Sequence, residues 1–203
     1  MASAHYNLAV VALRRGEIEE AKKSAAKALE LEESVDFILG LADIELRLGE
    51  FEKAKELYEE ALKKDPSLGR ALEGLSVIAG RQGNDSRAIE LLQKAVAANP
   101  DSFTAHFNLA VLEERAGRLE SALEQYEKAR ELNGESYEAA FYLGLLLQRL
   151  ERYGESAGAL EAAARLDEKN IEVFRALAKA YQELEDYDQA EFALENAHFT
   201  QSG

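Results

Sequence analysis

Apolar and small residues recur along the chain with the spacing of short amphipathic helices. Residues 103–136 read FTAHFNLAVLEERAGRLESALEQYEKARELNGES, in which Leu109 and Glu113 are four positions apart and Ala122 and Ala129 are seven apart. Residues at these separations lie on one face of a helix. The stretch therefore predicts two short helices joined by a tight turn, with small residues where the two helix backbones approach each other.

The same pattern recurs six times. Aligned on the turn and the small residues, the repeats run 2–34, 35–68, 69–102, 103–136, 137–170 and 171–203. A small residue occupies each of two second-helix positions, at Ala21, Ala54, Ala88, Ala122, Ser156 and Ala190, and at Ala28, Ala61, Ala95, Ala129, Ala163 and Ala197. A hairpin of this size cannot bury its apolar face alone, so the repeats must stack on one another.

A glycine that can adopt a left-handed conformation separates the two predicted helices in the first four repeats, at Gly16, Gly49, Gly83 and Gly117. Glutamates, Glu151 and Glu185, stand there in the last two repeats. If a left-handed residue is needed, each glutamate costs up to about 1 kcal/mol. Polar residues at or just before the repeat boundaries are predicted helix N-caps: Ser34, Ser67, Ser102, Ser136 and Asn170.

The period, the leucine–small pairs, the turn glycines, the alanines and the late prolines Pro66 and Pro100 resemble the tetratricopeptide repeat (TPR) family. The resemblance covers the whole chain. It implies an all-α fold, an α-solenoid of six helix-turn-helix units with about 12 antiparallel helices in a right-handed superhelix. We expect residues 1–203 to form a single array. We also expect it to be a fragment of a longer protein, because the family's usual final capping helix is missing.

The composition and charge argue against further classes of function. The net charge of −15 argues against binding nucleic acid through its phosphates. The chain has no cysteine, and its longest apolar run, 139–147, is about half of what a membrane span needs. The sequence opens without a signal peptide, so we predict a cytoplasmic protein with no membrane insertion.

No catalytic motif is present. The sequence holds no glycine-rich phosphate loop, HExxH motif or nucleophile elbow, and its paired acids follow the spacing of a solvated helix surface. His5 and His106 occupy equivalent positions in two distant repeats, which favours a structural role for both. We therefore predict a protein that is not an enzyme and needs no cofactor.

The resemblance implies that the first helices line a concave groove. Positions 2, 6, 9 and 13 of the repeats would form one stripe, which carries seven basic and five acidic residues in a strongly acidic chain. Five repeats end this stripe in arginine, at Arg14, Arg47, Arg81, Arg115 and Arg149. These arginines would bind the carboxylates of a peptide. The alternative is that they only complement the negative end of each helix.

Large apolar residues are predicted on the same face of the fourth and fifth repeats: Phe107, Val111, Phe141, Tyr142 and Leu145. They would form an anchor pocket for a ligand. The alternative is that some of them pack between adjacent repeats. Asn7 and Asn108 occur in similar contexts, HYNLAVV and HFNLAVL, where the family uses asparagine to bind the backbone of a peptide. The family's clamp for the terminal carboxylate of a chaperone tail is missing.

The sequence thus predicts a scaffold or adaptor that binds a protein or peptide segment in its concave groove. Two alternatives remain. The chain could be a structural module that forms homo-oligomers through the ends of the array, or a regulatory segment of a larger enzyme.

Overall fold

The computed structural model describes residues 1–199, and within this range every regular element is an α-helix. The helices are α1 (Ala2–Arg14), α2 (Ile18–Leu31), α3 (Val35–Arg47), α4 (Phe51–Lys64), α5 (Gly69–Arg81), α6 (Asp85–Ala98), α7 (Phe103–Arg115), α8 (Leu119–Leu132), α9 (Tyr137–Arg149), α10 (Tyr153–Leu166), α11 (Ile171–Glu183) and α12 (Tyr187–Phe199). The predicted all-α fold of consecutive helix-turn-helix pairs is confirmed. The expectation of a missing capping helix concerns the end of the chain. Residues 200–203 there lie outside the described residues.

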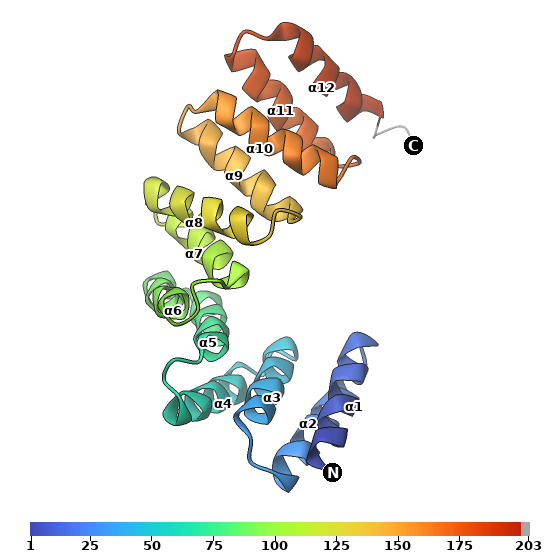
Figure 1. The fold of residues 1–203 in the computed structure, drawn as a ribbon, viewed down its shortest axis with the longest axis vertical. Helices are drawn as coiled ribbons and strands as arrows, with labels where there is room; N and C mark the ends of the chain where they lie inside the picture. The colour runs from blue at the N-terminus through green and yellow to red at the C-terminus, as the bar shows by residue number, and fades with distance from the viewer. Residues whose placement is uncertain (200–203) are drawn as a thin grey trace. The chain divides into compact units, whose positions relative to one another are not determined.

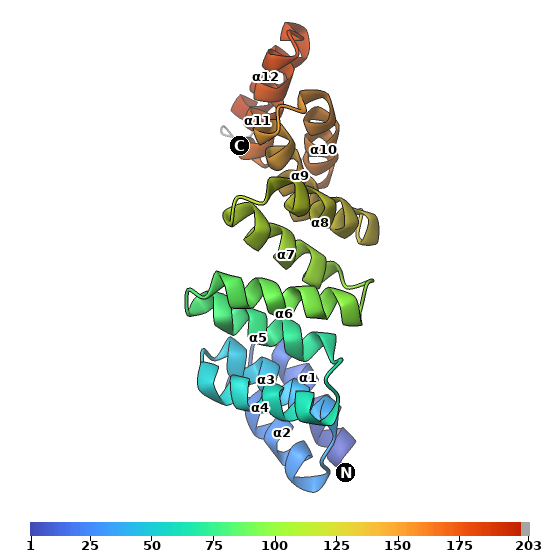
Figure 2. The ribbon, with the colours of Figure 1, turned by 90° about the vertical axis from the view of Figure 1, so that its left-hand side faces the viewer.

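The helices form two compact units, an N-terminal unit of residues 1–100 and a C-terminal unit of residues 101–203. Within each unit every helix packs on the next along the chain, in antiparallel pairs (Figure 1). The first helices of neighbouring repeats also touch: α3 contacts α5, and α9 contacts α11. Figure 2 shows the pair α5 and α6 side by side in the N-terminal unit. Within each unit, we call the side formed by the odd-numbered helices the first-helix face and the side formed by the even-numbered helices the second-helix face. None of the described helices has the length and apolarity needed to cross a membrane.

The turn inside each hairpin requires one left-handed residue. The φ angles of Gly16, Gly49, Gly83 and Gly117 are 76–77°. Glu151 and Glu185 adopt the same conformation, with φ of 58° and 61°. The turn geometry is therefore imposed by the packing of the repeat even where glycine is missing, and the two glutamates carry backbone strain.

Replacing Glu151 with glycine should stabilise the protein by about 1 kcal/mol, because glycine adopts a positive φ without steric cost. The measurement is the urea midpoint of unfolding. Glu151→Ala is the control, since alanine removes the charge but keeps the Cβ and should give no comparable gain. Equal gains from both variants would mean that charge, not backbone strain, sets the effect.

Small residues hold the helices of each hairpin close together. The twelve alanine and serine positions predicted from the sequence are all buried, with an exposed fraction of at most 5%. Ser156, the one serine among them, is fully buried and its Oγ donates a hydrogen bond to the backbone oxygen of Gly144, 2.8 Å away. This bond satisfies the hydroxyl in an apolar setting, so serine can replace alanine there.

The helix N-termini follow the prediction in part. Ser102, Ser136 and Asn170 each accept a hydrogen bond from a backbone N–H in the first turn of α7, α9 and α11. Ser34 is the N-cap of α3 without such a side-chain bond. The prediction for Ser67 was wrong, because α5 begins one residue later and Ser67 instead hydrogen-bonds Asp65.

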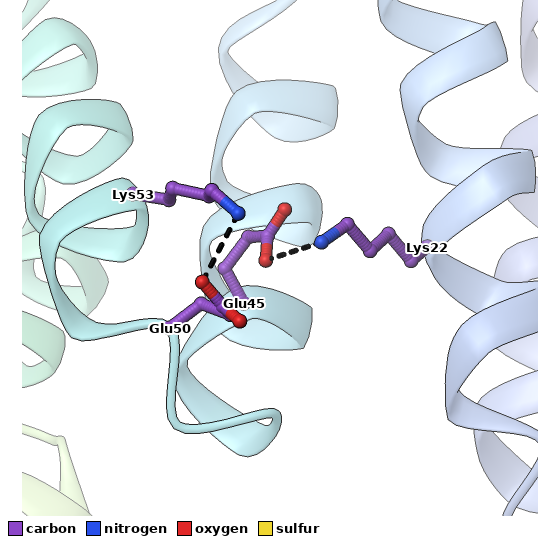
Figure 3. Close-up of polar contacts among 4 residues, drawn as sticks. All are labelled: Lys22, Glu45, Glu50 and Lys53. Atoms are coloured by element: carbon purple, nitrogen blue, oxygen red, sulfur yellow. Dashed lines mark hydrogen bonds and ion pairs between the residues drawn. The ribbon is translucent and has the colours of Figure 1, made fainter.

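A partly buried ion pair links the first two repeats. Lys22 Nζ of α2 donates to Glu45 Oε2 of α3 at 2.8 Å, and Glu45 is only 4% exposed (Figure 3). The hydrogen bond to Glu45 raises the pKa of Lys22 above its usual value. A second pair, Lys53 with Glu50 at 3.0 Å, lies beside it but on the surface.

Replacing Lys22 with methionine should destabilise the protein by about 1–2 kcal/mol, because Glu45 would keep a buried charge without its partner. Lys53→Met removes an exposed pair of the same type, so it should cost much less than Lys22→Met. Chemical denaturation of both variants makes the comparison. Equal losses would contradict a special role for burial at Glu45.

Candidate peptide-binding surface

The predicted arginine ladder stands at the ends of the first helices. Arg14, Arg47, Arg81, Arg115 and Arg149 are each the last residue of their helix and are exposed. In the N-terminal unit, no ion pair joins Arg14, Arg47 or Arg81 to another of the described residues. These three cations are open to a ligand, and their place at a helix C-terminus also favours the helix dipole. Both interpretations of these arginines therefore stay predictions.

Arg149 has an internal partner. Its Nη1 donates to Glu114 Oε1 at 2.5 Å, and Glu114 also accepts a hydrogen bond from the hydroxyl of Tyr126 at 3.1 Å. Tyr126 is fully buried, so Glu114 lies between the buried core of the fourth repeat and a cation of the fifth. The guanidinium of Arg149 therefore serves a contact between repeats, which the sequence pattern alone did not reveal.

A similar cluster lies in the N-terminal unit. The hydroxyl of Tyr58 in α4 donates to Asp43 Oδ1 of α3 at 2.5 Å, and Arg70 Nε of α5 donates to Asp43 Oδ2 at 2.9 Å. Burial, followed by the nearby carboxylate, raises the pKa of Tyr58 far above its usual value, and the same causes act on the pKa of Tyr126. Each cluster joins three helices across a repeat boundary.

These clusters were missed at the level of sequence. Asp43 and Glu114 occupy different positions in their repeats, so alignment of the repeats does not bring them together. The available signal was the tyrosine. Tyr58 and Tyr126 occupy the same second-helix position, where a buried hydroxyl must find an acceptor.

Aromatic rings form a connected network on the first-helix face of the C-terminal unit. Tyr142 in α9 lies 5.9 Å from Phe107 in α7, 6.4 Å from Tyr126 in α8 and 5.7 Å from Phe141, measured between ring centroids. Tyr142 is nevertheless 41% exposed. Phe107 packs edge-on against Tyr126, with centroids 5.8 Å apart. The network is anchored in the core and reaches solvent at Tyr142.

The other predicted apolar residues divide between surface and core. Phe107, Val111 and Leu145 are half-buried and pack against the cores of the C-terminal unit. Phe141 is only 9% exposed and belongs to the core formed with α10 and α11, so its ring is closed to a ligand. The neighbouring repeat covers it. The alternative that some of these residues pack between repeats therefore describes Phe141.

The remaining polar residues of the predicted site differ in exposure. Asn7 is exposed on α1 and Asn108 is half-buried on α7, and they belong to different compact units. His106 is 6% exposed and its Nδ1 is 2.7 Å from Gln125 Oε1, which agrees with the structural role expected from its position.

The stacked helix pairs define the structural class of the protein, an α-solenoid. Family models of the tetratricopeptide repeat match residues 2–34, 39–102 and 78–134, which together span more than half of the chain. A model of subunit 3 of the anaphase-promoting complex (cyclosome) matches residues 115–197. The chain belongs to the tetratricopeptide repeat family.

Solved structures agree on the fold. PilF of Pseudomonas aeruginosa is similar over 100% of this chain and 93% of its own, with a TM-score of 0.84 and 24% identity. YrrB, described as a TPR protein with an unusual peptide-binding site, is similar over 87% of this chain and 92% of its own (TM-score 0.76, 23% identity). MamA is similar over 79% of this chain and 94% of its own, with a TM-score of 0.71 and 23% identity. No curated protein sequence matches the chain.

Proposed function

We propose that the chain is an adaptor that binds a peptide segment of a partner protein on its first-helix face. The observation that carries the proposal is Tyr142, a large aromatic side chain that is 41% exposed although its ring contacts three other rings. A rigid, partly desolvated aromatic group loses little entropy on binding and makes a strong anchor. Val111 and Phe107 extend the apolar surface beside it.

Basic side chains would orient the ligand. In the N-terminal unit Arg14, Arg47 and Arg81 offer guanidinium groups to the carboxylates of an acidic segment. In the C-terminal unit Asn108, one position from Phe107, would bind the peptide backbone. We treat the two surfaces as separate contacts, each with its own part of the partner. The likeness to YrrB, a protein described as having a peptide-binding site, supports the proposal.

Replacing Tyr142 and Val111 with serine should reduce capture of the partner from native lysate by about tenfold or more. Tyr187→Ser is the matched control, because Tyr187 is 67% exposed on α12 and outside the proposed surface. The measurement is quantitative mass spectrometry of proteins retained by each immobilised chain. Identical capture by the wild type and the Tyr142→Ser/Val111→Ser variant would contradict binding at this face.

A second candidate function is self-association between copies. Tyr187 and Phe192 on α12 are 67% and 63% exposed, and α12 carries Asp188, Glu191 and Glu195 without a lysine or arginine. α1 contains Arg14 and no acid, so the two helices are complementary in charge. Light scattering would test this candidate, because the mean mass would rise with protein concentration.

A further inference from the structure

A basic groove runs along the second-helix face of the N-terminal unit. α4 and α6 both pack on α5, and between them α5 forms the floor of two adjoining hollows of about 270 and 410 Å³. The hollows share Glu59, Leu75, Arg87 and Leu91. They therefore form one groove, which follows α4 and α6 for about two helical turns.

The floor of the groove and the parts of the walls next to it are apolar. Leu62 and Leu75 are half-buried, and Leu72, Ile78 and Leu91 lie beneath the surface with exposed fractions of 2–5%. An occupant would bury leucine side chains that the fold leaves partly in water. The free energy of binding would then come from the hydrophobic effect, which also holds the repeats together.

The rim of the groove is basic in an acidic protein. Lys55, Lys63, Arg87 and Lys94 line it, and Glu59 is the one acid among the lining residues. Arg87 pairs with Glu90 at 2.9 Å on the surface. The three lysines form no ion pair with any residue that the structure describes. The rim therefore offers charge to a negatively charged occupant.

The corresponding groove of the C-terminal unit has the opposite character. Between α8 and α10 the charged lining residues are Glu127, Glu131 and Glu155, with Arg130 the one base. The backbone architecture of the two places is the same, so the difference lies in side chains alone. A partner that fits the first groove by charge would be repelled by the second.

We propose that this groove binds an acidic amphipathic helix of a partner protein. The walls are helices whose backbone groups are already hydrogen-bonded, so they offer nothing to the backbone of an extended peptide. A helical occupant satisfies its own backbone and presents apolar side chains at positions i, i+4 and i+7 to the floor. Its remaining acidic residues face the lysines of the rim. This site is independent of the surface around Tyr142.

The test uses two labelled synthetic helices of about 15 residues, or roughly four turns. Both carry leucine at positions i, i+4 and i+7, and the remaining residues are alanine and either glutamate or lysine. We expect the full chain to bind the glutamate peptide at least about tenfold more tightly than the lysine peptide. The variant Lys63→Glu/Lys94→Glu should reverse this preference. Amide chemical-shift changes should map to residues 55–94.

Two control variants show whether the groove itself sets the preference. Lys23→Glu/Lys27→Glu makes the same change in net charge on α2, outside the groove, and should keep the wild-type preference. Tyr142→Ser should also leave it unchanged, so that failure of the proposed function and failure of this inference can be told apart. Equal affinity for both peptides, loss of the preference in the α2 control, or shifts confined to the first-helix face would each overturn the proposal.

Discussion

Raising the pH from 7 to 11 should destabilise the protein by about 1.4 kcal/mol for each of Tyr58 and Tyr126, or about 3 kcal/mol together. Both side chains are fully buried, and burial beside Asp43 and Glu114 keeps the pKa of each hydroxyl well above its usual value near 10. Above about pH 10 the unfolded chain releases these two protons and the folded chain retains them. Stability is therefore present in full below the unfolded pKa and falls as the pH rises above it.

The measurement is the urea midpoint of the wild type and of Tyr58→Phe/Tyr126→Phe at both pH values. The double variant loses two hydrogen bonds and should be less stable at neutral pH, by about 1 kcal/mol for each bond. Its stability should fall less on going to alkaline pH. Tyr187→Phe alters an exposed tyrosine and should follow the wild type. An equal fall in the wild type and the double variant would assign the alkaline loss to other groups.

Replacing Gly74 with alanine should destabilise the protein by about 2 kcal/mol. A Cβ at Gly74 in α5 would overlap the ring of Tyr58 and lie 2.7 Å from its hydroxyl oxygen. The ring cannot turn away, because it is fully buried and its hydroxyl is bonded to Asp43. The added methyl group therefore forces the packing of α4 against α5 to change.

Gly80→Ala is the matched control, in the same helix. A Cβ at Gly80 meets no atom within 4 Å, so the substitution should stabilise α5 by about 0.5–1 kcal/mol through lower backbone entropy in the unfolded state. Thermal and urea unfolding of both variants give the comparison. A Gly74→Ala variant as stable as Gly80→Ala would show that the tyrosine has room to move.

The period of the sequence was enough to predict the fold of the chain, because the helices of every repeat pack through the same positions. A small residue in every repeat at the positions of Ala54 and Ala61 fixes where two backbones meet, and Gly49 fixes where the chain turns. The fold could be predicted even where one signal failed. Glu151 adopts the turn conformation of the glycines because the surrounding contacts of α9 and α10 impose it.

The surface was harder to predict, because it depends on which neighbour covers each side chain. Phe141 and Tyr142 are adjacent aromatic residues, yet the next repeat buries the first and leaves the second exposed. Arg149 shares its position with Arg81, but only Arg149 pairs with a carboxylate of the preceding repeat, Glu114. Such differences arise from contacts between repeats, and the periodic pattern of the sequence does not show them.

The tyrosine clusters also bear on the order in which the repeats can stack. Similar hairpins risk assembling out of order, a recognised hazard of repeat arrays. Alignment places Thr104 at the position of Arg70, so removal of residues 69–102 would leave Asp43 without its cation. Removal of residues 137–170 would set Glu183 in the place of Arg149, against Glu114. Each of these two junctions thus accepts its own successor repeat by charge and disfavours the next one along the chain.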